Sequence, residues 1–577
     1  MNRNGVIMEK WVVTAKRADF QAIAKKFHID PVTARLIRNR NVIGDDNIQT
    51  YLYGSRKDML DPWKMKDMEK IVCILIEKIQ QKQKIRIIGD YDIDGVMSTY
   101  ILLKGLMGAG ACVDHVIPNR MTDGYGINEN LIQQASQDQI DTIITCDNGI
   151  AAFSQIERAR ELGMTVLVTD HHEVPFEKTE EGRREILPPA QAIVNPKQKN
   201  CDYPFKGLCG AGVAMKVMEA LYQKIQSETD IVDQMLQYAA IATIGDVMDL
   251  VEENRIIVKE GLKRLHHTEN IGLQELIRVN HLEPEQISPY HIGFVIGPCL
   301  NASGRLDTAL RALKLLYCDD REDAARLAGD LKQLNDSRKE MTAQGVEEAV
   351  NLVETTSLKN DTVLVVYLPE CHESLAGIIA GRIRERYHKP SFVLTKGEEG
   401  VKGSGRSTEC YSMYEKLCEC GEYLTKFGGH PMAAGLSLKE ENMEPFRKKI
   451  NELSGLGPEN LIEKVAIDVP MPINYIRKDL VQELKILEPF GKGNEKPVFA
   501  QKGLRVQGAR VMGKNRNVVK LRLTDEAGYA IDSVYFGDGD KFLEDVNRKK
   551  TLSVVYYPEI DTYMGREKIQ IVIKNYQ

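Results

Sequence analysis

The stretch IRIIGDYDIDGVMSTYILLKGLM, residues 85–107, decides the fold. Its first residues form a short apolar run that is typical of a buried β-strand, and its last residues keep the spacing of a helix. Between them, Asp90, Asp92 and Asp94 occupy alternate positions directly after the strand. Carboxylates this close repel one another and raise one another's pKa, so a cation is expected among them.

Short apolar runs continue to alternate with helical patterns as far as about residue 250. The runs are KIRIIGD, CVDHVIP, DTIITCD, TVLVTD and QAIVNP, and the clearest helical patterns are VMSTYILLKGLMGAG and GIAAFSQIERARELGM. Strand and helix in turn predict an open α/β domain with a largely parallel sheet. Ligands bind such sheets at the carboxyl ends of the strands, which is where Asp90, Asp147 and Asp170 fall.

The rest of the chain predicts further parts. Residues 320–355 are charged, lack proline and keep helical spacing, which indicates a long exposed connector helix. A second α/β segment follows, and short strands separated by Gly and Asp turns then predict a small closed barrel of the oligonucleotide-binding kind. The expected parts are an N-terminal extension (1–75), a parallel-sheet catalytic domain (76–318), the connector helix (319–357), a second α/β domain (358–457) and a nucleic-acid-binding barrel (458–577).

Composition narrows the class of protein. A formal net charge of −6 argues against a uniformly basic surface, although a local basic stripe suffices for nucleic acid. The 11 cysteines lack a disulfide framework or zinc spacing, as is typical of reduced thiols. No apolar run is long enough for a signal peptide or a bilayer span, so a cytoplasmic protein without a membrane partner is expected.

Two more strand ends and one helix add polar side chains to the aspartates of the opening stretch. TCDNGI supplies Asp147, and VTDHHE supplies Asp170, His171 and His172. Asp246 stands in an otherwise apolar helical stretch, where a carboxylate is costly unless it is paired or binds metal. Carboxylates with one or two imidazoles suit Mn²⁺ or Mg²⁺ better than a thiolate zinc site does. We therefore expect two divalent cations with a bridging aspartate, the arrangement that hydrolyses phosphoesters.

Two other interpretations of these motifs are weaker. DYDIDG begins like a calcium-binding EF-hand loop, but the twelfth position holds Ile101 instead of Glu and a strand precedes the loop. CGAGVAMK, which begins at Cys209, is close to a dinucleotide-binding loop, yet Met215 occupies the position of the third small residue. A packed helix start accounts better for this second motif.

The motifs GDYDIDG, TCDNGI, TDHHE and IGDVMD resemble the four successive motifs of the DHH/DHHA1 phosphoesterases, which are named for Asp-His-His. IPNRMTDGYG, YPFKGLCGAGVAMK, GPCLNASGRL, VKGSGRS, FGGHPMAAG and LEPFGKGNEKP follow in the order found in the single-strand-specific exonucleases of that family. The resemblance covers nearly the whole chain from about residue 80. It implies a 5′-to-3′ exonuclease that releases 5′-mononucleotides from single-stranded DNA by two-metal hydrolysis, in DNA repair and recombination.

The resemblance also implies roles for the polar side chains. Asp147 would bridge the two cations, His172 would contact the scissile phosphate, and Asp90 would be an outer ligand. The implied metal ligands are Asp92, Asp94, Asp147, His171 and Asp246.

Other positions would handle phosphate. Arg305 would offset charge on the phosphoryl group and so complete a catalytic set with Asp147 and His172. Cys299 stands where these exonucleases commonly carry Arg, which predicts weaker substrate binding if that Arg contributes. The residues implied to bind phosphate or the 5′ end are Arg120, Ser404, Arg406 and His430.

The predicted barrel holds a local concentration of positive charge. Eight basic residues and no acid lie between residues 496 and 522, although the chain as a whole is acidic. A solvated barrel face is the plain alternative, but in a chain that resembles a nuclease a single-strand track is favoured. The predicted track is Lys502, Arg505, Arg510, Lys514, Arg516, Lys520 and Arg522.

Two rival functions are weaker. A scaffold relative without metals should have lost ligand residues, and all of them are present here. A hydrolase of dinucleotides or pyrophosphate should lack the basic barrel. The expected partner is single-stranded DNA, alongside a single-strand-binding protein and a helicase, and the expected state is a monomer.

Overall fold

The computed structural model describes residues 9–120, 126–179, 182–227, 230–397, 400–563 and 565–577. The chain forms two compact units. The larger unit comprises residues 11–270, 282–297 and 466–577, and the smaller unit comprises residues 9–10, 271–281 and 298–465, each within the described ranges. Among the described helices, none combines the length and the apolar character that crossing a membrane requires.

The larger unit is built on a five-stranded sheet in the order β3-β2-β4-β5-β8, and all of its pairings are parallel. The predicted fold class is confirmed, because each of the five apolar runs forms one strand. Strands β4 and β5 are buried on both faces, as the continuous apolar runs of parallel sheets require. The strands are β2 (Lys84–Ile88), β3 (Cys112–Val116), β4 (Thr142–Cys146), β5 (Thr165–Thr169) and β8 (Ala192–Val194).

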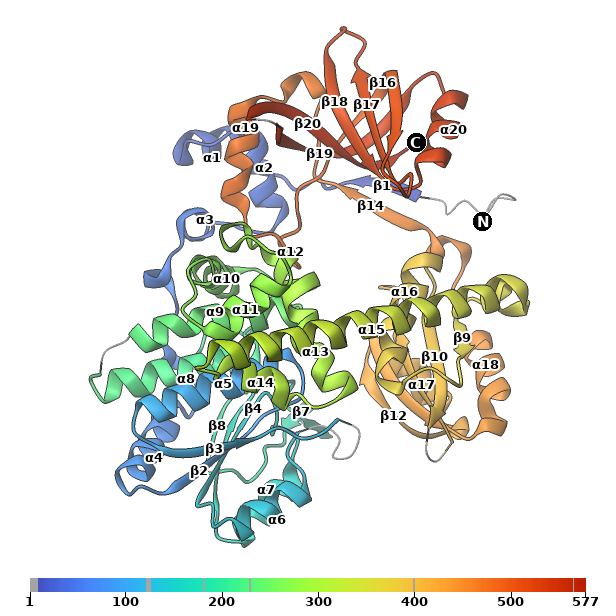
Figure 1. Cartoon of the computed structure of the whole chain (residues 1–577). Helices are drawn as coiled ribbons and strands as arrows, with labels where there is room; N and C mark the ends of the chain where they lie inside the picture. The colour runs from blue at the N-terminus through green and yellow to red at the C-terminus, as the bar shows by residue number, and fades with distance from the viewer. Residues whose placement is uncertain (1–8, 121–125, 180–181, 228–229, 398–399, 564) are drawn as a thin grey trace. The chain divides into compact units, whose positions relative to one another are not determined.

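Helices cover both faces of this sheet (Figure 1). On one face, Ile132 of α6 (Glu129–Gln137) and Ile156 of α7 (Phe153–Glu161) are fully buried in one core with Ile143. The other face is covered by α4, α5 and α8, with α9 and α10 packed further out. These helices are α4 (Met68–Gln80), α5 (Ile93–Gly108), α8 (Gly210–Lys224), α9 (Asp230–Gly245) and α10 (Glu252–Leu265).

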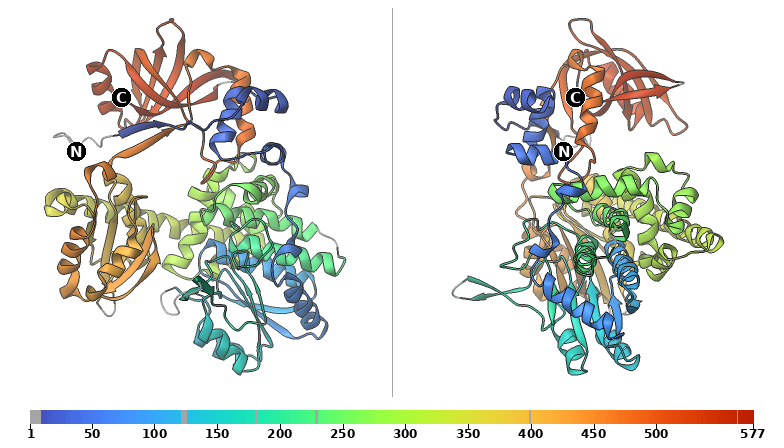
Figure 2. Two further views of the ribbon diagram at one scale, coloured as in Figure 1. Left: turned by 180° about the vertical axis from the view of Figure 1, so that it is seen from behind. Right: turned by 90° about the vertical axis from the view of Figure 1, so that its left-hand side faces the viewer.

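A small hairpin is inserted between the last two strands of the sheet. It consists of β6 (Phe176–Thr179) and β7 (Gly182–Glu185), which pair antiparallel. The hairpin extends away from the body of the domain in the right-hand view of Figure 2. It forms a two-stranded sheet of its own, separate from the parallel sheet.

Residues 466–577 form the predicted barrel. β16 pairs with both β17 and β19, which closes the sheet on itself. Phe499 and Tyr556 fill its interior without exposure, and Phe542 of α20 (Gly539–Arg548) is equally buried. The strands are β15 (Val469–Pro470), β16 (Phe499–Met512), β17 (Val518–Thr524), β18 (Ala530–Phe536), β19 (Leu552–Tyr563) and β20 (Arg566–Tyr576).

The N-terminal helices share one hydrophobic core with the barrel. Leu36 and Leu52 are buried in the same cluster as Leu484, which lies just after α19 (Lys478–Glu483). The buried Arg255 of α10 donates hydrogen bonds to the carbonyl oxygens of Tyr51 and Leu487 at 2.9 and 2.8 Å. One arginine thus ties the sheet domain, the N-terminal helices and the barrel together. The helices are α1 (Phe20–Phe27), α2 (Pro31–Asn39) and α3 (Asp45–Tyr53), which follow β1 (Glu9–Val13).

The smaller unit holds the predicted second α/β domain and the predicted long helix. Its sheet has the order β12-β13-β11-β10-β9, with β9 parallel to β10 and the other pairings antiparallel. The long helix is α15 (Arg321–Thr355). The strands are β9 (Leu364–Tyr367), β10 (Ser391–Gly397), β11 (Gly400–Arg406), β12 (Leu424–His430) and β13 (Ala433–Leu438), and β14 (Glu463–Ile467) follows them. The remaining helices are α11 (Ile271–Val279), α13 (Gly297–Leu306), α14 (Leu310–Leu316), α16 (Glu373–Tyr387), α17 (Met413–Glu419) and α18 (Met443–Glu452).

Candidate metal centre and nucleic-acid contacts

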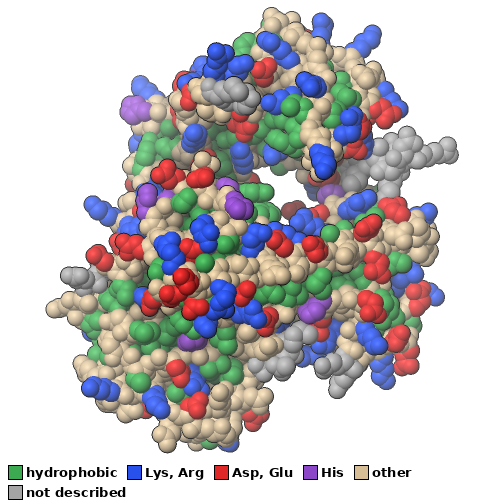
Figure 3. Space-filling view, in the orientation of Figure 1, with side chains coloured by type: hydrophobic (Ala, Val, Ile, Leu, Met, Phe, Trp, Pro, Cys, Tyr) green, Lys and Arg blue, Asp and Glu red, His purple; other side chains and the backbone are tan. Residues whose placement is uncertain are grey.

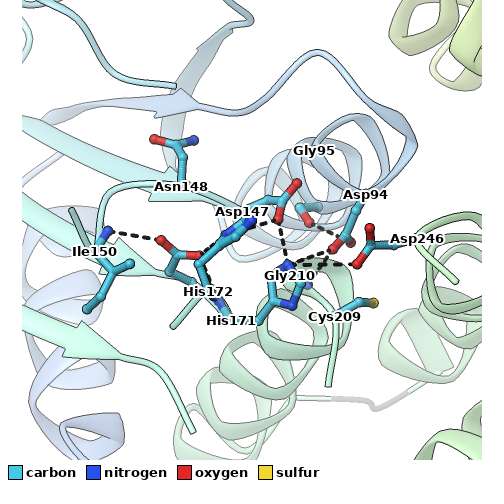
Figure 4. A network of polar contacts seen from close by, with 12 residues as sticks. Asp94, Gly95, Asp147, Asn148, Ile150, His171, His172, Cys209, Gly210 and Asp246 are labelled. Atoms are coloured by element: carbon cyan, nitrogen blue, oxygen red, sulfur yellow. Dashed lines mark hydrogen bonds and ion pairs between the residues drawn. The ribbon is translucent and has the colours of Figure 1, made fainter. Parts of the chain in front are cut away.

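Three aspartates stand at the carboxyl edge of the parallel sheet. Asp147 directly follows β4, Asp170 directly follows β5, and Asp90 follows β2 after one glycine, so they end three adjacent strands. Asp147 has a φ of 61°, in the left-handed region that residues other than glycine rarely adopt. Strained backbone of this kind persists where the surrounding structure enforces it, commonly at functional sites. Figure 4 shows Asp147 at the centre of the resulting polar network.

The other two aspartates of the opening stretch are held by helix N-termini. Asp92 caps α5, and its carboxylate accepts hydrogen bonds from the backbone N–H of Asp94 at 2.9 Å and of Gly95 at 3.1 Å. Because of this cap, α5 begins at Ile93, earlier than the sequence pattern predicts. The carboxylate of Asp94 accepts from the backbone N–H of Gly210 at 2.6 Å, at the start of α8. The positive end of a helix dipole favours negative charge at both places.

Position 210 requires glycine, because Asp147 leaves no room for a side chain there. A Cβ at Gly210 would lie 2.7 Å from the Asp147 Cβ and 3.0 Å from its Oδ1, which is too close for any side chain. A Cβ at Gly212 would meet Leu208 at 3.4 Å, an ordinary contact. The first glycine of CGAG therefore lets the helix start reach the aspartates, while the second is less constrained.

The adjacent histidines are oriented by Asp170. The Asp170 carboxylate accepts hydrogen bonds from the backbone N–H of Ile150 at 2.9 Å and of His171 at 2.7 Å, and it lies 2.8 Å from His172 Nδ1. The Nε2 of His171 lies 3.0 Å from Asp147 Oδ1 and 3.5 Å from Asp94 Oδ2. The two rings are tilted by 58°, so the histidines face different groups. Asp170 is thus a positioning residue.

A strained turn directs Asp246 to the same place. Asp246 follows α9, and the next residue, Val247, has a φ of 56° in a position where helices usually end on glycine. The backbone N–H of Met248 donates to the carbonyl of Thr243 at 3.0 Å, which closes the turn. Asp246 Oδ2 then lies 3.9 Å from His171 Nε2.

Three overlapping groups of donor atoms result, and within each group one oxygen or nitrogen per residue lies within 4.8 Å of the others. Asp147 and His171 each belong to two of the groups. Such overlap fits two hard dications that share ligands, and oxygen donors with one or two imidazoles suit Mn²⁺ or Mg²⁺. The groups are Asp90, Asp92 and Asp147; Asp147, His171 and His172; and Asp94, His171 and Asp246.

The raised pKa values of the carboxyl groups in this cluster indicate that a cation binds among them. Burial, with the charge of Asp92, raises the pKa of Asp90 to about 8, and burial with the charge of Asp94 raises that of Asp246 to about 8. Burial and neighbouring carboxylates also raise the pKa of Asp92 and Asp147. Bound dications are the largest local charges in such a site and reverse these shifts. The residues present therefore fit the metals.

The histidines differ in protonation. Burial lowers the pKa of His171, which favours the neutral imidazole that binds metal. Burial acts the same way on His172, but its hydrogen bond to Asp170 and the charge of that carboxylate outweigh it and raise the pKa of His172 to about 9. Without bound metal, this raised pKa favours the protonated form of His172, which can donate a hydrogen bond.

Arg120 lies beside the loop that carries the first aspartates. Its guanidinium carbon is 5.0 Å from the centroid of the Tyr91 ring, and Tyr91 stands between Asp90 and Asp92 in the chain. A cation over an aromatic face is attracted by the ring quadrupole. Arg120 is thus held near the aspartates.

The smaller unit brings other predicted phosphate contacts together. Arg406 donates to Ser404 Oγ at 3.2 Å, and both lie against Gly377 of α16, where a Cβ would come within 2.8 Å of each. Arg305 donates to the carbonyl oxygen of Ser374, in the first turn of the same helix, at 3.1 Å. His430 and Arg406 pair with the same residue of β13 from opposite sides, so they share one end of the sheet.

A hollow of about 730 Å³ crosses the strands of the barrel. Three residues of the predicted track, Arg510, Lys520 and Arg522, line it. Lys502, Arg505 and Lys514 are not among its lining residues, and Arg516 is paired with Asp540 outside it. Basic side chains are spread over the face of the barrel seen in Figure 3. The other charged residues of the hollow are Arg566, Lys568, Asp532 and Asp561.

Comparison with known proteins follows the same division of the chain. Residues 84–243 match the DHH family, N-terminal domain, residues 360–455 match the DHHA1 domain, and residues 467–575 match the RecJ OB domain. The single-stranded-DNA-specific exonuclease RecJ of Bacillus subtilis is 35% identical over 571 residues, covering 98% of this chain and 70% of that protein. The chain belongs to the RecJ family. The RecJ of Escherichia coli is 33% identical and covers 95% of this chain and 96% of its own length.

Solved RecJ structures agree with the fold. The crystal structure of RecJ in complex with Mn²⁺ from Thermus thermophilus matches with a TM-score of 0.82 at 26% identity, covering 99% of this chain and 80% of that one. The structure of the same protein with Mg²⁺ matches with a TM-score of 0.79 at 25% identity, covering 99% and 78%. The predicted family and its domain types are confirmed.

The sequence patterns did not indicate three features of this chain. Asp170 looked like another strand-end acid, although its place beside two histidines could have indicated an orienting role. Gly210 was interpreted as a packed helix start, and nothing in the local pattern shows that it touches Asp147. Arg566 and Lys568 lie more than forty residues after Arg522, the last residue of the basic stripe. They reach the hollow because β20 pairs with β18.

Cys299, where the resemblance led us to expect Arg, is buried inside the protein. Its side chain has no exposure, and its Sγ lies 3.4 Å from Asn335 Nδ2 and 3.7 Å from Asn280 Nδ2. Burial raises the pKa of this thiol, so it stays protonated. In this chain the Cys299 side chain therefore contacts the residue that follows α11 and one residue of α15. The predicted effect on substrate affinity stays a prediction.

Proposed function

We propose that this chain is a metal-dependent exonuclease that removes nucleotides from the 5′ end of single-stranded DNA. The observation that carries the proposal is the set of three overlapping donor groups that share Asp147 and His171. The names of its RecJ relatives support single-stranded DNA as the substrate. The 5′ polarity and the release of mononucleotides rest on the sequence resemblance.

In this proposal the metal ligands are Asp92, Asp94, Asp147, His171 and Asp246, with Asp90 as an outer ligand and Asp147 as the bridge. Two Mn²⁺ or Mg²⁺ ions held there would offset the crowded carboxylates and supply Lewis-acid activation of phosphate and water. His172, held at Nδ1 by Asp170, is suited to donate a hydrogen bond to a phosphoryl oxygen as negative charge develops.

The arginines and the barrel have binding roles in the proposal. Arg120 and Arg305 would contact phosphate oxygens, which suit the planar guanidinium group. Ser404, Arg406 and His430 would hold the 5′ terminus. The basic residues of the hollow would attract the strand further along, largely without regard to sequence.

The deciding experiment digests 5′-labelled and 3′-labelled single strands and matching duplexes with chelated protein, before and after adding Mn²⁺ or Mg²⁺. We expect no cleavage without metal and, with metal, early release of the 5′ label from single strands only. Cleavage that survives thorough chelation would contradict the assigned metal centre. Early release of the 3′ label would contradict the polarity.

A length series tests the rival small-substrate hydrolase. Dinucleotides cleaved as efficiently as strands long enough to reach the barrel would favour that rival.

A second comparison tests Arg406 as a residue that binds the 5′ end. Removing the 5′ phosphate from the substrate should slow cleavage by the wild type, but it should not further slow cleavage by Arg406→Ala.

We also propose that the protein works as a monomer in the cytoplasm, in DNA repair and recombination. A helicase would expose the strand for it, and a single-strand-binding protein would cover that strand. The composition of the chain and the RecJ family support this setting. Light scattering on the purified protein checks the monomer, and co-purification checks the partners.

A further inference from the structure

Two aromatic side chains on the larger unit stack on each other in solvent. Tyr290 and Phe294 are each 63% exposed. Their ring centroids are 5.0 Å apart, and their planes differ by only 29°. Single exposed apolar residues are ordinary on protein surfaces, but a stacked and exposed aromatic pair is a flat apolar platform ready for a third ring.

The backbone beneath the pair is firmly held. The short helix α12 (Pro289–His291) continues directly into a π-helical turn over Ile292–Ile296, whose first and last side chains are buried without exposure. Ser288 caps the helix through His291 Nδ1, which lies 3.0 Å from the serine Oγ. The Tyr290 ring also makes an edge contact with His291 at 5.7 Å between centroids. Turns of π-helix occur frequently at functional sites.

The same helical segment packs against two isoleucine side chains that lie close in sequence to metal-centre aspartates. A Cβ at Gly293 would lie 3.7 Å from Ile244, two residues before Asp246. A Cβ at Gly297 would lie 3.2 Å from Ile93, which stands between Asp92 and Asp94. All of these residues belong to the larger unit, so the aromatic pair and the aspartates share one scaffold.

We propose that the Tyr290–Phe294 pair is a stacking platform for a base of the single strand that is being cleaved. The inference rests on the proposed function. It adds the side chains on which one base of the substrate strand would stack. Every base has a π-face, so such stacking tolerates any sequence. Bases in a duplex are already stacked and paired, so the platform also favours single strands.

The test measures kcat/KM for release of the 5′ nucleotide by the Mn²⁺-loaded full chain. The substrates are 5′-phosphorylated strands that carry one abasic residue at successive positions from the 5′ end. For the wild type, we expect one position near that end to lose between about 5-fold and 100-fold when its base is absent. The double variant Tyr290→Ala/Phe294→Ala should lose a similar factor on the intact strand, with no further loss at that abasic position.

This non-additivity identifies the partner of the rings. The stacking platform would be overturned if the loss from the double variant and the loss from the abasic substrate simply multiplied. It would also be overturned if the double variant cleaved intact strands as well as the wild type does. Either result would favour a contact of the aromatic pair with another protein. The variants Tyr290→Phe and Phe294→Tyr keep both rings and should behave as the wild type. Tyr53→Ala removes a ring that is 47% exposed on α3 and should also leave cleavage unchanged.

The same data separate this proposal from the proposed function. A wild type that fails to cleave intact single strands contradicts both. A wild type that cleaves them, but shows no special abasic position, contradicts only the stacking platform. Equal thermal unfolding midpoints for the double variant and Tyr290→Phe exclude misfolding as the cause of a loss.

Discussion

The metal centre and the hollow of the barrel both gather charged side chains, but they do so in opposite ways. At the metal centre, Asp90, Asp94 and Asp147 are almost without exposure and are fixed by helix starts and strained backbone. In the hollow, Lys520 and Arg522 alternate with buried residues along β17, and Arg510 is an exposed residue of β16. Buried charges act strongly and at fixed positions, whereas exposed charges are screened and interchangeable.

This difference predicts that substitutions at the metal centre abolish chemistry, while those in the hollow change affinity by small steps. The substitution with the largest expected effect is Asp147→Asn. It removes the shared ligand of two donor groups, and we expect cleavage to fall by at least about 1000-fold while single-strand binding persists. Single-turnover cleavage and a separate binding titration measure the two quantities.

Stability should move the other way in the same variant. Burial, together with the charges of Asp94 and Asp92, raises the pKa of Asp147, so keeping this carboxyl in the folded and chelated protein costs stability that the neutral amide does not cost. The thermal unfolding midpoint of chelated Asp147→Asn should exceed that of chelated wild type. A lower midpoint would indicate that Asp147 holds the fold together rather than the metals.

Gly210→Ala should have the next largest effect, because the new Cβ would lie 2.7 Å from the Asp147 Cβ. The start of α8 or Asp147 must then shift, and we expect metal affinity and cleavage to fall about 10-fold to 100-fold, as for other supporting contacts of metal ligands. Metal titration followed by activity measures both effects. Gly212→Ala is the matched control on the same helix and should be tolerated.

Asp170→Asn is expected to cost somewhat less, because it disturbs ligand orientation without removing a ligand. The amide cannot stabilise a charged His172, and we expect cleavage to fall about 10-fold. NMR titration of His172 should show a pKa below that of the wild-type ring. An unchanged His172 pKa with normal cleavage would argue that Asp170 has no positioning role.

The smallest effect belongs to the barrel. Arg522→Gln removes one charge from the hollow, so single-strand affinity should fall a few-fold and the salt dependence should lose about one unit of slope. Arg516→Gln is the matched control, because Arg516 is paired with Asp540 outside the hollow. An equal loss in both variants would place the strand elsewhere on the barrel.

Much of this site could be predicted from local sequence. A parallel sheet brings the ends of its strands to one edge, so strand-end residues such as Asp90 and Asp147 must lie close together once the alternation of strand and helix is recognised. Asp246 was found because a carboxylate in an apolar helix requires a partner. The orienting role of Asp170 was missed, since an acid that binds backbone N–H groups looks the same in sequence as an acid that binds metal.

By itself, the sequence determined the α/β pattern, the side chains available for metal and the family, because these depend on neighbouring residues and on motif order. Only the tertiary structure decided that Gly210 touches Asp147, that β20 adds positive charge to the hollow, and that Tyr290 and Phe294 stack on each other in solvent. Such contacts arise from helix packing and barrel closure. These steps join residues far apart in the chain, and no local pattern records the distances between them.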